Sequence, residues 1–379
     1  MKKKKKLSFI GKIFLFFNLI VIVLLLLSYT ASWIPPDRWW AFSFLGIAYP
    51  VFFVINVVFV VIWLITSRKK YFLLSLFALL LGWNHIRSYV SFHSKTPEET
   101  ISPRLKIMSF NVRMFDLYNW ENQKNIYTRN SIFDLIKKKD PDILCIQEFF
   151  SDSDKKRNFN TLDTLVKLQR AKYAHVDYFK NFNRLEHWGM VTFSAYPIIK
   201  MDRFQFCNSE NNYMIYTDIL YMGDTLRVFN IHFESIRLGK EDLLFVEDVT
   251  GNTAEKQDIT FGTKKIYWKL KAAFQKRAKQ AREAVELIKK SPHPVLVCGD
   301  FNDTPSSYVY HQMTQQLNDA FVTSGNGLGK TYAGNIPSFR IDYILYDNHF
   351  NAYNFQIIKK KFSDHFPVSC VLQPKMEIK

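Results

Sequence analysis

Two short stretches near the C-terminus combine the side chains that hydrolytic chemistry requires. Residues 298–303 (CGDFND) follow an apolar run that is typical of a buried strand, and residues 363–368 (SDHFPV) lie further along the chain. Carboxylate, amide and imidazole groups at strand ends are the groups from which metal-assisted hydrolytic sites are built. The two stretches therefore predict cleavage of a phosphate ester.

Further polar residues stand at the ends of most of the strands that we predict between residues 105 and 372. They are Asn111, Glu148, His232, Asp300, Asn302, Asp342, Asp364 and His365. Asp and Asn favour strand ends because they hydrogen-bond to the local backbone, so any single one can be purely structural. It is their recurrence along the whole segment that predicts a site.

The pattern of apolar residues predicts the elements that position these side chains. Short apolar or alternating runs predict strands at 105–111, 143–147, 189–193, 213–220, 226–232, 295–299, 341–346 and 368–372. Apolar residues at helical spacing predict helices at 129–139 and 266–290. Strands interleaved with helices indicate an α/β domain over residues 105–379, and the polar, proline-containing segment 94–104 predicts a linker before it.

Residues 1–93 predict a membrane anchor. About three transmembrane helices are expected, at 13–33, 41–66 and 71–92. The third is the weakest because its unbroken apolar core is short, and the second argues against a cleaved signal peptide. Basic residues at 2–6 and 68–70 are typical of the cytoplasmic side. Three crossings place the domain outside the cytoplasmic membrane of a bacterium, with the N-terminal helices in contact with the lipid bilayer, whereas two crossings leave it in the cytoplasm.

The formal net charge of +17 is divided between the two parts of the chain. Residues 1–104 contain 13 basic and 3 acidic residues, a net +10, and residues 105–379 contain 38 and 31, a net +7. Much of the basicity therefore belongs to the predicted membrane topology. The remainder is compatible with an anionic substrate but does not identify one.

The four cysteines show no metal-ligand spacing, and three of them lie in apolar, strand-like runs. We therefore expect buried thiols. A disulfide between Cys145 and Cys298 can form if their strands are neighbours and the compartment is oxidising.

Six blocks of sequence, in order, resemble the endonuclease/exonuclease/phosphatase superfamily. They are 107–112 (IMSFNV), 142–148 (DILCIQE), 230–233 (NIHF), 299–303 (GDFND), 340–344 (RIDYI) and 363–368 (SDHFPV). That superfamily includes secreted deoxyribonucleases, abasic-site repair nucleases, neutral sphingomyelinases and inositol polyphosphate 5-phosphatases. The resemblance implies a four-layer α/β sandwich in which two mainly antiparallel sheets pack face to face with helices outside. It also implies an active site at one end of the sandwich.

The resemblance implies a Mg²⁺ site, for which Mn²⁺ can substitute. Glu148 is similar to the principal ligand of the family, with Asn111 beside it and Asp364 as an additional ligand, directly or through water. Oxygen donors of this kind suit a hard divalent cation.

The same resemblance implies roles for the remaining polar residues. Asp300 is expected to position or deprotonate the attacking water, and Asn302 to donate hydrogen bonds to the phosphate. His365, oriented by Asp342, and His232 are expected to face the phosphate. Either Asp300 or the His365–Asp342 pair can serve as the general base, and the sequence does not decide between them.

Two positions separate this chain from the repair nucleases. Arg113 stands where many of those enzymes have an acidic residue, which argues against a two-metal site; it either contacts phosphate or faces solvent. His232 is closer to the histidine-bearing version of secreted nucleases and sphingomyelinases.

The substrate is therefore expected to be a phosphodiester, with nucleic acid as the first candidate. A phospholipid, as for a sphingomyelinase-like phosphodiesterase, and a polyphosphate, as for a phosphatase, are the alternatives within the class. A membrane-tethered binding module without catalytic activity is the alternative of another class. The sequence indicates no protein partner.

Overall fold

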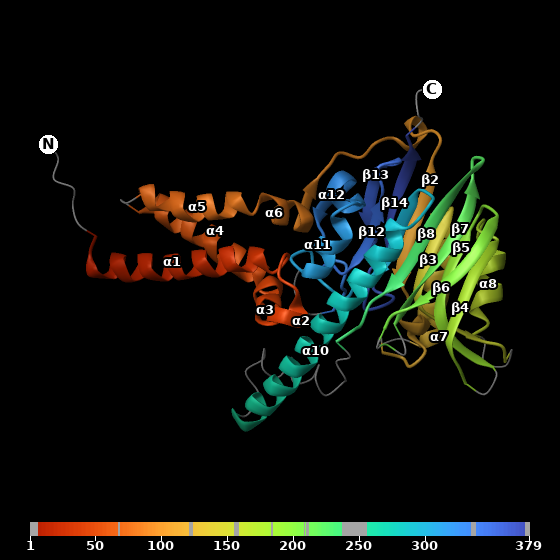
Figure 1. Ribbon diagram of the computed structural model, residues 1–379, viewed down its shortest axis with the longest axis horizontal. Coiled ribbons are helices and arrows are strands. Elements are labelled where there is room, and N and C mark those ends of the chain that lie inside the picture. The colour runs from red at the N-terminus through yellow and green to blue at the C-terminus, as the bar shows by residue number, and fades with distance from the viewer. Residues whose placement is uncertain are drawn as a thin grey trace.

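The computed structural model describes residues 7–66, 69–120, 124–154, 159–182, 185–207, 209, 212–236, 256–334 and 339–375. Helices from the N-terminal part lie side by side, and one end of this group rests against a sandwich of two sheets (Figure 1). The chain crosses from the helices to the sandwich over the segment 94–104. Thr96 in that segment exchanges two hydrogen bonds with Asn354, at 2.8 and 2.7 Å, and Ile101 is buried against the domain.

The N-terminal part is helical. Its elements are α1 (Phe9–Thr30), α2 (Pro36–Trp39), α3 (Ala41–Ile47), α4 (Tyr49–Ile65), the 3-10 turn η1 (Lys69–Tyr71), α5 (Phe72–Leu81) and α6 (Trp83–Tyr89). The hydroxyl of Ser8 caps α1 by accepting a hydrogen bond from the backbone of Gly11. An α-helix of 22 residues is about 33 Å long, which matches the hydrocarbon core of a bilayer.

The expectation of about three transmembrane helices is wrong in number. By length and composition, α1 is long and apolar enough to cross a membrane, and α3 with α4, bent by 56°, forms at most a second span. The third expected span, 71–92, is broken instead. Helix α5 ends after ten residues at Gly82, and the polar helix α6 and the short strand β1 (Val90–Phe92) follow. A side chain at Gly82 would collide with the ring of Tyr29, at 2.3 Å, so close packing requires glycine at this break.

The sandwich consists of two six-stranded sheets. In order across the sheets, they are β10-β12-β9-β8-β7-β6 and β13-β14-β2-β3-β5-β4. Neighbours are antiparallel except for two parallel pairs, β2 with β3 and β8 with β9. The expected α/β fold with two packed sheets is thereby confirmed.

The strand bounds are β2 (Leu105–Asn111), β3 (Ile143–Asp152), β4 (Tyr173–Phe182), β5 (Glu186–Ser194), β6 (Ile198–Gln205), β7 (Tyr213–Tyr221), β8 (Asp224–His232), β9 (Val295–Asp300), β10 (Asn318–Asp319), β11 (Asn326–Leu328), β12 (Asp342–Tyr346), β13 (Phe350–Ile357) and β14 (Val368–Pro374). The helices of this part are α7 (Asn125–Lys139), α8 (Thr161–Leu168), α10 (Lys256–Lys289), α11 (Tyr308–Thr314) and α12 (Ala320–Ser324), with the turns η2 (Glu98–Thr100) and η3 (Arg113–Asp116). Strand β11 pairs with β1 and so joins the N-terminal part to the sandwich.

Three apolar clusters hold the layers together. One lies between the sheets and includes Ile107, Val228 and both Cys145 and Cys298, which are free thiols. The second joins α10 and α11 to β8 and β9, and the third joins α7 and α8 to β2 and β3. Burial of each large apolar side chain contributes about 1.5–3 kcal/mol, so these contacts fix how the strand ends meet.

The parallel pairs align the ends of the strands that carry the polar residues. In β8 and β9, His232 stands opposite Asp300. One residue earlier, Ile231 stands opposite Gly299, and a Cβ atom on Gly299 would lie 2.0 Å from the Ile231 carbonyl oxygen. Glycine at this position therefore permits the close approach that brings His232 beside Asp300.

Candidate active site

The ends of β2, β3, β8 and β9 and the start of β12 meet at one end of the sandwich. They bring together most of the residues that the sequence pointed to. Asn111 ends β2, His232 ends β8 and Asp300 ends β9, while Asp342 begins β12 opposite Asp300. Asn111, Asp300 and Asp342 are almost completely buried.

Asn111 connects the two sheets through its side-chain amide. Its Nδ2 donates to Glu148 Oε1 and to Asp300 Oδ2, both at 3.1 Å. Its Oδ1 accepts a hydrogen bond from the backbone of Arg113 at 3.0 Å. One carboxylate from each sheet is thus held on the same amide group.

Glu148 reaches the site because β3 is irregular at this point. The pairing of β3 with β5 shifts between Ile146 and Phe149, and Glu148 adopts a left-handed backbone conformation with φ of 49°. Asn302 is also left-handed, with φ of 52°. Residues other than glycine rarely occupy this region, and such strain concentrates at functional sites.

His365 and Asp342 form a buried pair. The Nδ1 atom of His365 lies 3.0 Å from each carboxylate oxygen of Asp342, and the Nε2 atom lies 3.6 Å from Asp300 Oδ2. The Thr331 hydroxyl accepts a hydrogen bond from the backbone of Asp342 at 3.1 Å. The ring of Tyr332 meets the imidazole edge to face, with centroids 5.9 Å apart.

His232 and Asn302 flank Asp300. The Nε2 atom of His232 lies 3.6 Å from Asp300 Oδ2 and 3.7 Å from Glu148 Oε1. The backbone amide of Asn302 donates to Asp300 Oδ1 at 2.8 Å, and its Nδ2 donates to the Phe233 carbonyl at 3.0 Å. The Asn302 side chain therefore ties the loop after β9 to the loop after β8.

Arg113 and Asp364 lie at the mouth of the site as an ion pair. Arg113 Nε is 3.5 Å from Asp364 Oδ2, and the guanidinium stacks over Trp120 at 4.4 Å. Both side chains remain partly accessible, at 22% and 28%. The Ser363 hydroxyl donates to the Asn111 carbonyl at 2.8 Å, which fixes the start of the loop carrying Asp364 and His365.

Burial and neighbouring charges separate the proton affinities of these groups. Burial raises the pKa of Asp300 to about 6 and lowers the pKa of His232 below its usual range. Burial also opposes protonation of His365, but the Asp342 and Asp300 carboxylates outweigh it and raise the pKa of His365 well above 6.5. One imidazole is therefore cationic at neutral pH and the other is neutral, a division that suits acid–base chemistry.

Glu148 is partly accessible but electrostatically crowded. Although 30% of its side chain is exposed, desolvation within the cleft and the nearby Asp364 carboxylate raise the pKa of Glu148. Four carboxylates, Glu148, Asp300, Asp342 and Asp364, face the cationic side chains of Arg113 and His365. Excess negative charge and hard oxygen donors fit a bound divalent cation.

Two groupings can hold such a cation. Asn111, Glu148 and Asp364 are the set expected from sequence. Among the described residues, Asp300, Asp342 and His365 form a second set whose ligand atoms all lie within 4.8 Å of one another.

Sequence reasoning missed two supports of the site. Gln147 Nε2 donates to Asn230 Oδ1 at 2.7 Å across the two sheets, one residue before Glu148 and two before His232. Arg277, 1% exposed, joins Asp303 Oδ2 at 3.1 Å to the Glu234 carbonyl at 3.0 Å. Asn230 lies in the block 230–233 that resembles the family. A polar residue inside an apolar strand was the signal that could have identified this support.

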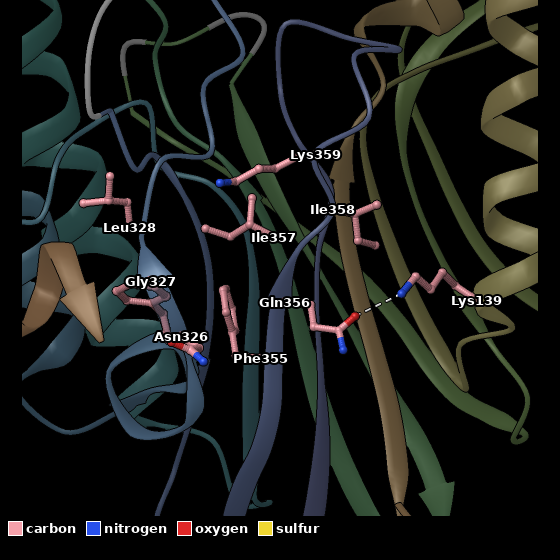
Figure 2. Close-up of a pocket in the computed structure, with 10 residues that line it drawn as sticks. Lys139, Asn326, Gly327, Leu328, Phe355, Gln356, Ile357, Ile358 and Lys359 are labelled. Carbon is pink, nitrogen blue, oxygen red and sulfur yellow. Dashed lines mark hydrogen bonds between the residues drawn. The ribbon is translucent and has the colours of Figure 1, made fainter. Parts of the chain in front are cut away.

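A cavity of about 330 Å³ adjoins Glu148 and His232 and is lined mainly by apolar and aromatic side chains, among them Trp188 and Tyr213. Figure 2 shows a different cavity of about 370 Å³, where Lys139 donates to Gln356 at 3.0 Å and Lys359 forms part of the lining. None of the predicted site residues lines this second cavity. The strand-end cleft is therefore the candidate active site.

Family models match two parts of the chain. Residues 108–365 match the Endonuclease/Exonuclease/phosphatase family, and this match covers more than half of the chain. The chain belongs to the endonuclease/exonuclease/phosphatase family. Residues 11–89 match a domain of unknown function, DUF8431. The expected enzyme class, a phosphoric ester hydrolase, is confirmed by this membership, and the family typically depends on divalent metal ions.

Solved structures share the fold at low identity. The endonuclease/exonuclease/phosphatase from Bacteroides vulgatus is 17% identical with a TM-score of 0.53, over 72% of this chain and 100% of that chain. A family protein from Bacteroides thetaiotaomicron is 16% identical with a TM-score of 0.51, over 72% and 98%. The human Nocturnin catalytic domain with bound sulfate is 17% identical with a TM-score of 0.50, over 72% and 95%. No curated protein matches the chain.

Proposed function

We propose that the protein is a membrane-anchored, Mg²⁺-dependent phosphodiesterase. The observation that carries the proposal is the convergence of a buried His365–Asp342 pair, Asp300 and the Asn111–Glu148 pair around one cleft. Family membership supports hydrolysis of a phosphate ester.

Each residue of the cleft has a separate proposed role in binding or hydrolysing the phosphate ester. The His365 imidazolium, stabilised by Asp342, contacts the phosphoryl oxygens and offsets their charge. Asp300, with its pKa near 6, accepts a proton from the attacking water or positions it. Asn302 and the neutral His232 hold the phosphate from the other side, and Arg113 binds it at the mouth of the cleft.

Asn111, Glu148 and Asp364 are proposed to hold the Mg²⁺ ion, for which Mn²⁺ can substitute. When bound, the ion supplies Lewis-acid stabilisation of charge on the phosphoryl and leaving oxygens. A single ion is proposed because Arg113 pairs with Asp364 beside the acidic group.

We propose that α1 anchors the protein in the cytoplasmic membrane of a bacterium, with the bent pair α3–α4 as a re-entrant membrane segment that makes no second crossing. The two ends of α1 indicate on which side of the membrane the domain lies. Its N-terminal end follows the lysines at 2–6, and its C-terminal end meets the sandwich, where Ser32 Oγ donates to the Ser306 carbonyl at 3.2 Å. If the lysines stay in the cytoplasm, a crossing by α1 leaves the domain on the outer face, which supports that side.

Nucleic acid is the first substrate proposed. The Nocturnin domain binds a sulfate anion, which has the tetrahedral shape of phosphate. At 17% identity, the similarity shows a shared fold and does not identify a substrate for this chain. A phospholipid is the second candidate, because the sandwich directly contacts the end of α1. A polyphosphate is the third. A silent binding module is disfavoured because the acidic and imidazole groups of the cleft converge in hydrogen-bonding geometry.

The test uses the full chain purified in detergent. It is incubated with DNA, RNA, sphingomyelin, inositol phosphates and the generic diester bis(p-nitrophenyl) phosphate, with Mg²⁺ or with EDTA. We expect Mg²⁺-dependent hydrolysis that is abolished in Asp300→Ala and His365→Ala but retained in His349→Ala, a change at an exposed histidine. Activity retained in the first two variants, or absent from the unaltered chain on every substrate, would overturn the proposal.

The proposed side has a separate test. Alkaline phosphatase, which is active only outside the cytoplasm, is fused after Pro103. An active fusion supports the outer side, and an inactive fusion that is stably expressed refutes it.

A further inference from the structure

Three exposed tryptophans lie in the elements where the N-terminal helices meet the sandwich. Trp33 precedes α2, Trp39 is the last residue of α2, and Trp268 lies on α10, more than 220 residues further along the chain. Their exposed fractions are 68%, 65% and 52%. A soluble surface rarely leaves several such large apolar rings in water together, so this grouping calls for a partner.

Aromatic packing joins α10 to the N-terminal helices. The ring of Phe44 stacks on Tyr267 with centroids 5.2 Å apart, and Trp40 meets the same Tyr267 ring at 5.5 Å. Lys271 lies between Trp40 and Trp268, with its ammonium 4.8 Å from each ring. We call Trp33, Trp39, Trp268 and Lys271 the junction surface.

The junction surface lies at the end of α1. Helix α1 ends at Thr30, and three residues later the Trp33 ring contacts His311 of α11 at 4.1 Å. Two hydrogen bonds between Arg282 of α10 and the Asp37 carboxylate of α2, at 3.1 and 2.9 Å, hold α2 against α10. The position of α10 relative to α1 is therefore fixed on both sides of the surface.

The N-terminal half of α10 projects beyond the sandwich, past α2 and α3 (Figure 1). Residues 256–271 contain five lysines and one aspartate, a net charge of +4. A projecting basic helix with an exposed tryptophan has the composition of helices that lie at membrane surfaces.

We propose that the junction surface and the projecting half of α10 lie in the headgroup layer of a bilayer that contains anionic lipids. The inference rests on the proposed anchoring of α1 and goes beyond it, because an anchor alone does not orient the domain. Tryptophan prefers the boundary between hydrocarbon and headgroups. Lysine side chains next to it reach the lipid phosphates and strengthen binding to an anionic surface.

The contact brings the cleft to the lipid surface. Arg277, which holds the loops after β8 and β9, lies nine residues after Trp268 on the same helix. That separation is about 14 Å along the helix axis. A membrane-bound junction surface therefore keeps the proposed active-site loops close to the headgroup layer and favours phosphoesters presented there.

A lipid-quenching experiment on the full chain tests the contact. In a Cys207→Ser background, which removes the exposed cysteine, a fluorophore is attached to Lys264→Cys, one helical turn before Trp268. The matched control carries the label at Met222→Cys, in the exposed turn between β7 and β8. Both proteins are reconstituted into phosphatidylcholine–phosphatidylglycerol vesicles that contain lipids with a nitroxide near the headgroup.

We expect at least about threefold stronger quenching at position 264 than at position 222. Replacing Trp268 by Ala, or phosphatidylglycerol by phosphatidylcholine, should weaken the quenching at 264. Equal and weak quenching at both sites in protein that floats with the vesicles overturns the inference while leaving the anchor intact. Protein that does not float with the vesicles overturns the anchor and the inference together, and hydrolysis in solution is measured separately.

Discussion

The Nδ1 atom of His365 lies 3.0 Å from both carboxylate oxygens of Asp342. Because the pair is buried, water does not compete for this contact, and the proton on Nδ1 is held toward the carboxylate. The second ring nitrogen, Nε2, is thereby directed toward Asp300 and the centre of the cleft. The imidazolium is therefore fixed in one orientation before any substrate arrives.

Replacing Asp342 by Asn should remove that orientation and the charge that stabilises the imidazolium. We expect kcat on bis(p-nitrophenyl) phosphate to fall about 100-fold or more, with a much smaller change in KM, because His365 acts on the reacting phosphate. Steady-state kinetics with Mg²⁺ measures both constants. Asp224→Asn, at the exposed start of β8, is the control, and an Asp342→Asn enzyme as fast as this control would contradict the assignment.

Replacing Glu148 by Gln should distinguish the two possible cation sites. If Asn111, Glu148 and Asp364 hold the ion, calorimetric titration with Mn²⁺ should show at least about tenfold weaker binding to Glu148→Gln, and nearly unchanged binding to Asp342→Asn. EDTA should abolish activity in the unaltered chain. The reverse order of affinities would assign the ion to Asp300, Asp342 and His365 instead.

The strands nearest the cleft could be predicted from sequence, whereas several edge strands could not. The expected strand 105–111 coincides with β2, and 295–299 differs from β9 by one residue. Strands β4, β6 and β13 lie at sheet edges, and no strand was expected there. Edge strands are half exposed and tolerate Lys, Asp and Asn, so they lack the apolar run that identifies a buried strand.

The members of the site were predictable because their types and order were informative, but their supports were not. The bond between Gln147 and Asn230 depends on how two sheets face each other, and local patterns do not contain that register. The contacts of Arg277 depend likewise on where α10 crosses the sandwich. The third membrane span was misjudged because hydropathy does not show that Gly82 packs against Tyr29 and ends α5.

Replacing Arg277 by Met should destabilise the protein and slow catalysis together. The change leaves the buried Asp303 carboxylate without its partner, a loss of about 3 kcal/mol, and frees the loops after β8 and β9. Thermal unfolding in detergent should show a melting temperature lower by roughly 5 °C or more. Lys289→Met, at the exposed end of α10, is the control.

A second variant separates the effect of Arg277 on kcat from its effect on stability. Arg277→Lys keeps a positive charge but offers a single ammonium in place of the forked guanidinium. We expect it to recover stability more than kcat. Recovery of full kcat by lysine would show that charge alone, and not the bridge between the two loops, matters.

His175 should make the stability of the domain depend on pH. It lies between the sheets, with Nδ1 2.8 Å from the Thr217 hydroxyl, and burial lowers the pKa of His175 even though Asp177 and Asp202 oppose the shift. The unfolded chain takes up a proton at about pH 6.5, while the folded chain takes it up only at lower pH. Unfolding therefore gains a proton, and stability is lost, as the pH falls through about 6.5 toward the folded pKa. The melting temperature of the full chain should drop more between about pH 7.5 and about pH 5.5 than that of His175→Gln. His349→Gln, at an exposed position, should keep the unaltered pH response, and a His175→Gln response equal to it would show that this imidazole does not carry the effect.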